Sequence, residues 1–342
     1  ATHLHRAGRP GQVIYLDRSE RACGIARARV AARGLPNVAF ERMSLLDLPG
    51  SGLGPFDYID CCGVLHHLPD PAAGLAALLA VLAPGGGMGL MLYAPHGRTG
   101  VYMLQDALRT LAPETDSPAA RLDVAKRVMR HLPESAWLRF NRSFSDHLDG
   151  GDAGLYDLLL NPRDRAFDIR GLHALLTGAG LRITCLIEPT RYDPAIYLPD
   201  PKLRALAARL PPIERAALAE AVAGNIGTHV LYCVRETEWQ QAADPFAPDA
   251  VPLSREMPVG ELAKQIRPDG TLAFFFDGLR VPLPMPKLAL PLLSLVDGER
   301  TVGAIEAALR ERGIAAADAQ RGWREVWDTF SNLNRLLLLP PA

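Results

Sequence analysis

The first 95 residues alternate between short apolar runs and helix-forming segments, and this alternation constrains the fold more than any other feature. The segments are a strand over 12–16, a helix over 19–34, strands over 38–42 and 56–62, a helix over 71–82, a break at 83–87 and a strand over 88–93. Ser19 and Gly34 are typical residues for the two ends of the first helix. Regular strand–helix alternation is typical of an α/β fold with a mostly parallel sheet. We therefore expect a Rossmann-like domain.

The alternation resumes after a long interruption. Residues 96–166 and 190–227 read as helical insertions, whereas Asp168 begins a helix that is followed by strands over 181–188 and 228–235. Both insertions follow strands at the side where open α/β sheets form their ligand crevice. We expect one domain over 1–236, with the two insertions forming a lid.

A second unit is expected at the C-terminal end. Residues 237–256 are rich in Pro, Asp and Ala and read as a linker. Within 257–342, Asp277-Gly278 between two apolar runs predicts a hairpin, and helices are expected over 286–296, 302–312 and 317–334. We expect a small α+β module, winged-helix-like, which contacts a peptide or protein. The stripe of Trp323, Trp327 and Phe330 indicates a buried helix face.

Composition narrows the function. The net charge of −1 provides no basic field for binding nucleic acid. The five cysteines form no CxxC pair, which favours a reducing, cytoplasmic setting. No apolar stretch approaches the length of a membrane span. Neither nucleic acid nor a membrane is therefore an expected partner.

Four motifs occur in order at strand ends. They are Asp17, the segment SLLDLP at 44–49, the segment CGVLHHLPDP at 62–71, and LAPGG at 82–86. In this order and spacing they resemble the class I S-adenosylmethionine-dependent methyltransferases, in particular the small-molecule branch with a "VLHHL" segment. The resemblance covers 1–95 closely and 168–235 loosely. It implies that the family's first strand and glycine-rich loop lie before residue 1, with 1–7 as the remnant of the following helix.

The resemblance implies a binding site for S-adenosylmethionine. Asp17 would accept hydrogen bonds from both ribose hydroxyls, since a carboxylate offers two oxygens. Arg18 and Leu45 would flank the adenine. Ser44 stands where similar proteins often carry an acid, and a hydroxyl is a weaker acceptor there. The alternative for Asp17 is a solvated carboxylate before a helix.

The resemblance also places the methionine end of the cofactor against the backbone around Cys62, Gly63 and Val64, where Gly63 permits close approach. His66 or His67 would act as the base, because a neutral imidazole can take a proton from a hydroxyl or amine acceptor. The alternative is a histidine that caps a helix or satisfies a loop carbonyl. A metal site is not expected, since adjacent histidines point apart.

The loop after the fourth strand supplies candidate substrate contacts. Tyr93, His96 and Arg98 lie in it, and Arg98 could pair with a carboxylate or phosphate. A surface loop with a solvated arginine is the competing interpretation. The expected acceptor is a small molecule or a side chain presented by a partner.

Two other functions remain open. A non-catalytic scaffold that binds a partner is the first, because the sequence contains no glycine-rich phosphate loop. A NAD-dependent oxidoreductase is the second, although no tyrosine is followed four residues later by lysine. Nucleic-acid methylation is less favoured, since Gly63-Val64-Leu65-His66 stands where the Pro-Pro-aromatic motif would be.

Overall fold

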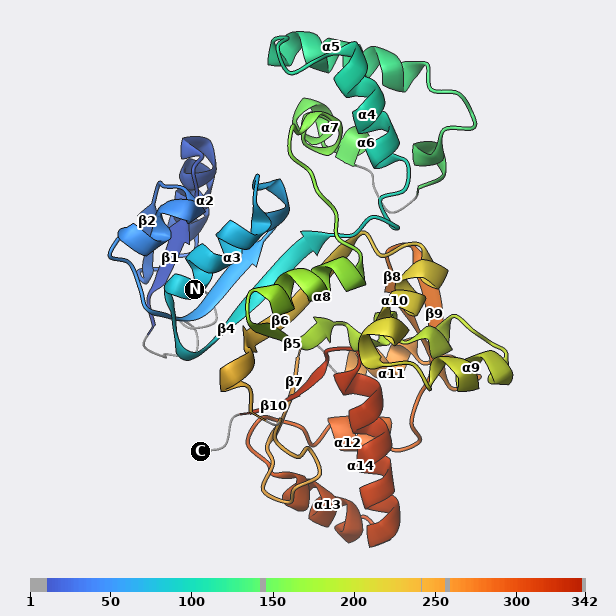
Figure 1. Cartoon of the computed structure of the whole chain (residues 1–342). Helices are drawn as coiled ribbons and strands as arrows, with labels where there is room; N and C mark the ends of the chain where they lie inside the picture. Colours follow the sequence, from blue (N-terminus) through green and yellow to red (C-terminus); the bar gives the residue numbers. More distant parts are fainter. Residues whose placement is uncertain (1–10, 142–145, 241, 256–258, 340–342) are drawn as a thin grey trace.

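The computed structural model describes residues 11–141, 146–240, 242–255 and 259–339 (Figure 1). The helix remnant expected at 1–7 lies outside these residues. The core consists of two sheets with the order β2-β1 and β3-β4-β6-β5. Their strands are β1 (Val13–Leu16), β2 (Val38–Glu41), β3 (Phe56–Cys62), β4 (Leu82–Tyr93), β5 (Leu181–Ile187) and β6 (Thr228–Arg235).

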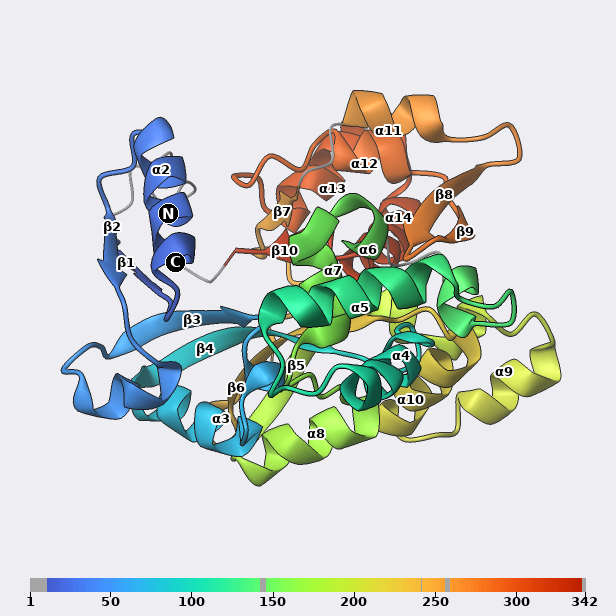
Figure 2. The same cartoon turned by 90° about the horizontal axis from the view of Figure 1, so that it is seen from above.

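The strand directions confirm the predicted α/β fold. β1 pairs with β2 and β3 pairs with β4 in parallel, whereas β6 is antiparallel to both β4 and β5. β5 therefore runs in the same direction as β3 and β4, so β6 is the one reversed strand of the four. Among the described residues no strand joins β1 to β3, and β1, β2 and α2 lie together beyond β3 (Figure 2).

Local capping sets the ends of the first helices. α2 (Glu20–Ala32) begins after Ser19, whose Oγ accepts a hydrogen bond from the Ala22 N–H at 3.2 Å. α3 (Pro71–Ala80) begins after Asp70, which accepts from Ala72 N–H at 2.9 Å. Two short 3₁₀ turns, η1 (Leu45–Gly50) and η2 (Leu65–His67), follow β2 and β3.

The predicted break at 83–87 is wrong in part. β4 begins at Leu82, which pairs with Phe56, and the next pair is Gly87 with Tyr58. The residues between them bulge out opposite a single residue of β3. The glycines thus shape an irregular start of the strand, where the sequence predicted a loop.

The two insertions are helical. The first holds α4 (Val101–Leu111), α5 (Pro118–Arg130), η3 (Trp137–Phe140), α6 (Asp146–Asp149) and α7 (Gly151–Leu160), and the second holds η4 (Pro189–Tyr192), η5 (Pro194–Ile196), α9 (Pro201–Ala207) and α10 (Pro212–Ala223). The first has its own apolar core, built around Leu108, Leu138 and Leu159. α8 (Ile169–Gly178) lies between the insertions and packs on the main core. That the insertions act as a lid stays a prediction.

The C-terminal part has a separate core, which includes Trp323 and Phe330. Its elements are β7 (Pro252–Ser254), α11 (Val259–Gln265), β8 (Thr271–Phe276), β9 (Leu279–Pro284), α12 (Ala289–Leu293), α13 (Val302–Glu311), α14 (Ala316–Ser331) and β10 (Leu336–Leu338), after η6 (Glu236–Glu238). α12–α14 and α4–α7 lie at opposite ends of the molecule (Figure 1). The domain boundaries and the winged-helix likeness stay predictions.

The hairpin prediction is confirmed. β8 and β9 pair antiparallel on either side of Asp277 and Gly278, whose φ angles are 45° and 80°. Positive φ at both central residues is the conformation that a two-residue hairpin turn requires. The hairpin contacts the first domain, where Asn225 Nδ2 donates to the Phe276 carbonyl at 2.7 Å and Arg191 pairs with Asp277.

Candidate functional site

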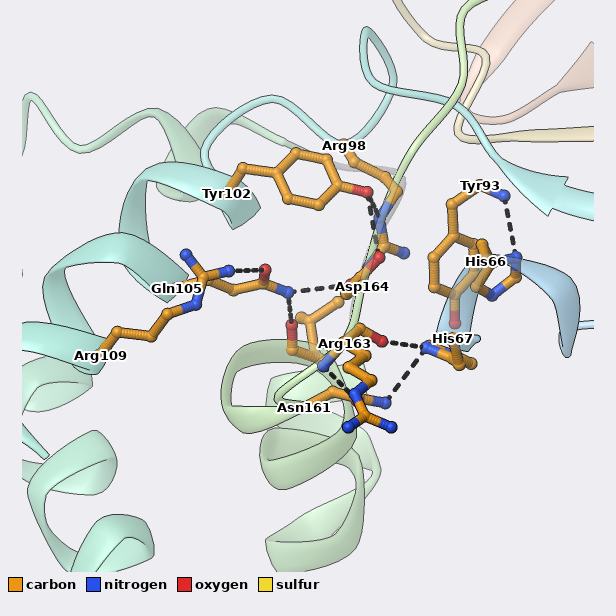
Figure 3. Close-up of polar contacts among 11 residues, drawn as sticks. His66, His67, Tyr93, Arg98, Tyr102, Gln105, Arg109, Asn161, Arg163 and Asp164 are labelled. Atoms are coloured by element: carbon orange, nitrogen blue, oxygen red, sulfur yellow. Dashed lines mark hydrogen bonds and ion pairs between the residues drawn. The ribbon is translucent and has the colours of Figure 1, made fainter. Parts of the chain in front are cut away.

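The polar residues of greatest interest lie at the carboxyl ends of β3 and β4. η2 brings His66 and His67 there, and β4 ends at Tyr93. The segment between α7 and α8 passes beside both strands, because Arg165 N–H donates to the His66 carbonyl at 3.1 Å and Phe167 N–H donates to the Tyr93 carbonyl at 2.9 Å. Side chains from three distant parts of the sequence therefore meet at the carboxyl ends of β3 and β4 (Figure 3).

His66 is fully buried and neutral. Its Nδ1 accepts a hydrogen bond from the Tyr93 N–H at 3.3 Å, which places the proton of a neutral ring on Nε2. The ring stacks on that of Tyr93, with centroids 3.8 Å apart. Burial, together with the charges of His67 and Arg98, lowers the pKa of His66 to about 3. So weak a base is poorly suited to take a proton at neutral pH.

His67 has the opposite arrangement. Its Nδ1 lies 2.6 Å from the Arg163 carbonyl oxygen, which can only accept, so Nδ1 carries the proton. Asn161 Nδ2 lies 3.3 Å from the same nitrogen, but two donors cannot bond each other and the shorter contact decides. Nε2 of this half-buried ring therefore keeps its lone pair. Of the two predicted bases, His67 has the geometry that accepts a proton.

Arg98 forms the inner wall of the site. Its side chain is 2% exposed, and Nη2 lies 2.9 Å from the Oδ2 of Asp164, whose side chain is 0% exposed. The guanidinium carbon stacks over the Tyr93 ring at 3.7 Å. Gln105 donates to the same carboxylate at 2.9 Å. Arg98 is thus neither a solvated loop residue nor open to solvent, and its contact with a substrate anion stays a prediction.

The sequence analysis does not predict three residues of the site, Asn161, Arg163 and Asp164. Their segment is short and polar, and nothing in it indicates that it would lie beside histidines almost a hundred residues earlier. The only local signal is Asp168, which ends the segment as a helix cap by accepting from Gly171 N–H at 2.7 Å.

Asp17 lies at the carboxyl end of β1 and is half-buried. Oδ1 accepts from the Ser19 N–H at 2.8 Å, and Oδ2 accepts from the Tyr15 hydroxyl at 3.2 Å. An ionised carboxylate has about four acceptor sites, so two further hydroxyl donors can be accommodated. Its neighbour Arg18 is exposed.

The segment after β2 is arranged differently from the prediction. Ser44 caps η1 by accepting from the Leu46 N–H at 3.2 Å. Leu45 is 7% exposed and packs in the main core, whereas Leu46 is 42% exposed. The contacts of Ser44 and Leu45 with an adenine stay predictions.

The end of β3 presents an accessible surface. Cys62 is exposed and Val64 is 40% exposed. Gly63 between them has a φ of 75°, a conformation that favours glycine, and its N–H donates to the Met91 carbonyl at 3.1 Å. Burial and the neighbouring Asp60 raise the pKa of the Cys62 thiol to about 12, so it stays protonated at neutral pH.

His96 lies apart from this group. Its Nδ1 is 3.2 Å from the Oε1 of Glu220, whereas Arg98 pairs with Asp164. Within the described ranges, no group of three or more His, Cys, Asp or Glu side chains is placed to hold a metal ion. In the same part of the chain, no helix combines the length and apolar character that crossing a membrane requires.

Sequence comparison gives the family of the N-terminal part. Residues 1–88 match the family described as "Methyltransferase domain". The chain is 36% identical over 80 residues to a ubiquinone biosynthesis O-methyltransferase of Thiobacillus denitrificans, covering 23% of this chain and 34% of that protein. It is 30% identical over 189 residues to an uncharacterized protein of Synechococcus sp., covering 54% of this chain and 44% of that protein. The chain thus spans less than half the length of these relatives.

Structural comparison supports the same fold over nearly the whole chain. The structure of PKMT2 from Rickettsia typhi in complex with AdoHcy superposes with a TM-score of 0.62 at 14% identity, covering 96% of this chain and 66% of that protein. The matched domain is a methyltransferase domain. The order of the motifs at the strand ends and the topology of the sheet agree with that match. Through residues 1–88, the chain contains a segment of the methyltransferase-domain family.

Proposed function

We propose that the protein transfers a methyl group from S-adenosylmethionine to a small molecule or to a side chain presented by a partner, with His67 as the base. The 2.6 Å contact between His67 Nδ1 and the Arg163 carbonyl carries this proposal, because it leaves Nε2 as the proton acceptor. The same contact would strengthen once the ring becomes charged, since charge-assisted hydrogen bonds are the stronger ones.

The residues at the strand ends fit the cofactor. Asp17 retains acceptor capacity for the ribose hydroxyls, and the exposed surface of Cys62, Gly63 and Val64 would take the methionine end. The cofactor would supply an electrophilic methyl group. The chain's own contribution is to orient the acceptor and to remove its proton.

Each side chain has a distinct task in this proposal. His67 Nε2 takes the proton of the acceptor hydroxyl or amine. The ring of Tyr93, held between His66 and Arg98, forms the wall beside it. The buried pair of Arg98 and Asp164 fixes that wall. A reducing, cytoplasmic location agrees with the free cysteines. The C-terminal module would recruit the acceptor or regulate access.

The test uses the polypeptide encoded by the complete reading frame, with methyl-labelled S-adenosylmethionine and a cell extract. We expect a labelled product by mass spectrometry and a measurable affinity for the cofactor. Asp17→Ala should weaken cofactor binding by about 2–3 kcal/mol, because a charged hydrogen-bond acceptor is lost. Asp57→Ala, at an exposed acid near the amino end of β3 and away from the motifs at the strand ends, serves as the control. No labelled product and no cofactor binding would favour the scaffold, and binding of NAD instead would favour the oxidoreductase.

A further inference from the structure

The turn that follows α7 carries the carbonyl that meets His67. The helix ends at Leu160, and Asn161 follows it with φ −60° and ψ 124°. Pro162 comes next, and the residue before a proline is restricted to extended backbone. The chain therefore leaves the helix at Asn161, and the Arg163 carbonyl then contacts the His67 ring (Figure 3).

The Asn161 side chain closes this turn. Its Oδ1 accepts a hydrogen bond from the Arg163 N–H at 3.1 Å. Asparagine side chains commonly form turns by bonding the backbone two residues ahead. Because a backbone N–H can only donate, this contact also fixes which end of the amide is oxygen and which is nitrogen.

The Arg163 carbonyl is held from both sides along the chain. On the α7 side, the Asn161 Oδ1 holds the Arg163 N–H. On the α8 side, the next residue is Asp164, whose carboxylate is paired with the buried Arg98 at 2.9 Å. The ion pair alone fixes one side of the carbonyl, and Asn161 supplies the constraint on the other.

The ring contacts of His67 orient its plane but do not select its tautomer. The ring is T-shaped against His66, with centroids 4.3 Å apart, and against Tyr93, at 5.6 Å. Both neutral tautomers can make such contacts. The position of the proton is set by the hydrogen bond of a ring nitrogen. Here that bond runs from Nδ1 to the Arg163 carbonyl, so the turn decides the tautomer.

The other end of the Asn161 amide shows what the turn prevents. With Oδ1 bonded to the Arg163 N–H, Nδ2 faces the ring and lies 3.3 Å from His67 Nδ1. If the carbonyl moved away, an amide N–H could donate to a proton-free Nδ1, and the ring proton would then lie on Nε2. The carbonyl determines the tautomer because the turn holds it closer, at 2.6 Å.

We propose that Asn161 is a positioning residue for His67, which keeps the lone pair of Nε2 free by holding the Arg163 carbonyl against Nδ1. Asn161 acts through the turn and does not contact the acceptor. The inference rests on the proposed role of His67 as the base in methyl transfer.

Nitrogen-15 NMR of the full chain tests the proposal, because ring nitrogens with and without a proton differ in chemical shift. Asn161→Ala removes the acceptor that holds the Arg163 N–H, so a proton on Nε2 of His67 should appear in a substantial part of the molecules. Asn161→Asp retains an acceptor for the Arg163 N–H and should keep the proton on Nδ1. An unchanged tautomer in Asn161→Ala, or loss of the Nδ1 proton in Asn161→Asp, would overturn the proposal.

Asn332→Ala is the matched control. Asn332 also directly follows a helix, α14, where its Nδ2 donates to the Asp328 carbonyl at 2.6 Å. Its loss should leave the His67 tautomer as it is, and an equal change of tautomer in this variant would contradict a specific role of Asn161. Thermal melting of each variant identifies any change that comes from loss of the fold.

Initial rates separate this inference from the proposed function. Asn161→Ala should lower the kcat of methyl transfer about tenfold and leave the KM of the acceptor unchanged, because the base is misplaced while binding is retained. A raised KM with an unchanged kcat would assign Asn161 to acceptor binding and overturn the positioning role. Absence of methyl transfer by the unchanged protein would reject the proposed function, whereas the tautomer in Asn161→Ala would still decide the positioning role.

Discussion

The inner and outer layers of the histidine site differ in how far their side chains are exposed to solvent. In the inner layer, the side chains of His66, Arg98 and Asp164 are at most 2% exposed, and the charged groups are paired with each other. In the outer layer, His67 is half-buried and only one of its ring nitrogens is committed, to the Arg163 carbonyl. The difference shows that the cluster has two parts. His66, Arg98 and Asp164 form a buried frame that holds the site in place, and His67 forms a more exposed rim that is available to react.

Removing a member of the frame should give the largest effect. Asp164→Ala leaves the buried Arg98 without its carboxylate partner, and breaking a buried ion pair costs about 3–5 kcal/mol. We expect a loss of that size in the free energy of unfolding, measured with urea. A loss below about 1 kcal/mol would mean that the inner layer is not a frame.

Changing the rim should leave stability intact and remove activity. His67→Gln keeps a polar side chain but has no group that takes a proton, so methyl transfer should fall about 10²–10⁴-fold. Initial rates of labelled methyl transfer measure this. His131→Gln, at an exposed histidine outside the site, is the control. A rate equal to that of the unchanged protein would remove His67 from the mechanism.

The buried histidine predicts a pH dependence of stability. The pKa of His66 falls from 6.5 to about 3 on folding, so the unfolded chain binds more protons than the folded chain between these values. Stability from this group is complete above pH 6.5 and is lost as the pH falls toward 3, with a slope of up to about 1.4 kcal/mol per pH unit. His66→Asn should flatten that slope in urea unfolding between pH 6.5 and 4. An unaltered slope would show that His66 titrates normally.

The smallest effect is expected at an exposed ion pair. Arg170 and Glu214 are joined by a 2.6 Å contact, with side chains 56% and 43% exposed. Water and salt screen such a pair, so Glu214→Ala should lower the free energy of unfolding far less than Asp164→Ala does. A loss equal to that of Asp164→Ala would show that burial does not separate the two pairs.

The sequence predicts those elements whose signals are local. β3 has the predicted bounds, Ser19 caps its helix, and Asp277-Gly278 forms the hairpin turn. Each depends on residues within a few positions of one another. The pairing of β7 with β10 was not predicted, because it joins residues about 80 positions apart.

In the candidate site too, the sequence predicts only what local signals indicate. The histidines of η2 are recognisable from their motif, but their partners are not. Asp164 and the Arg163 carbonyl reach the site only through the path of the chain after α7, which no local pattern indicates. The distinction between His66 and His67 likewise arises from burial and tautomer, and two adjacent histidines carry no sign of either.

The tautomer of His67 tests the central claim most directly. Nitrogen-15 NMR of the histidine rings at neutral pH, assigned with His67→Gln, reports which nitrogen carries the proton. The structure predicts a protonated Nδ1 and a proton-free Nε2 for His67. A protonated Nε2 with a proton-free Nδ1 would contradict both the contact with Arg163 and the role of His67 as the base.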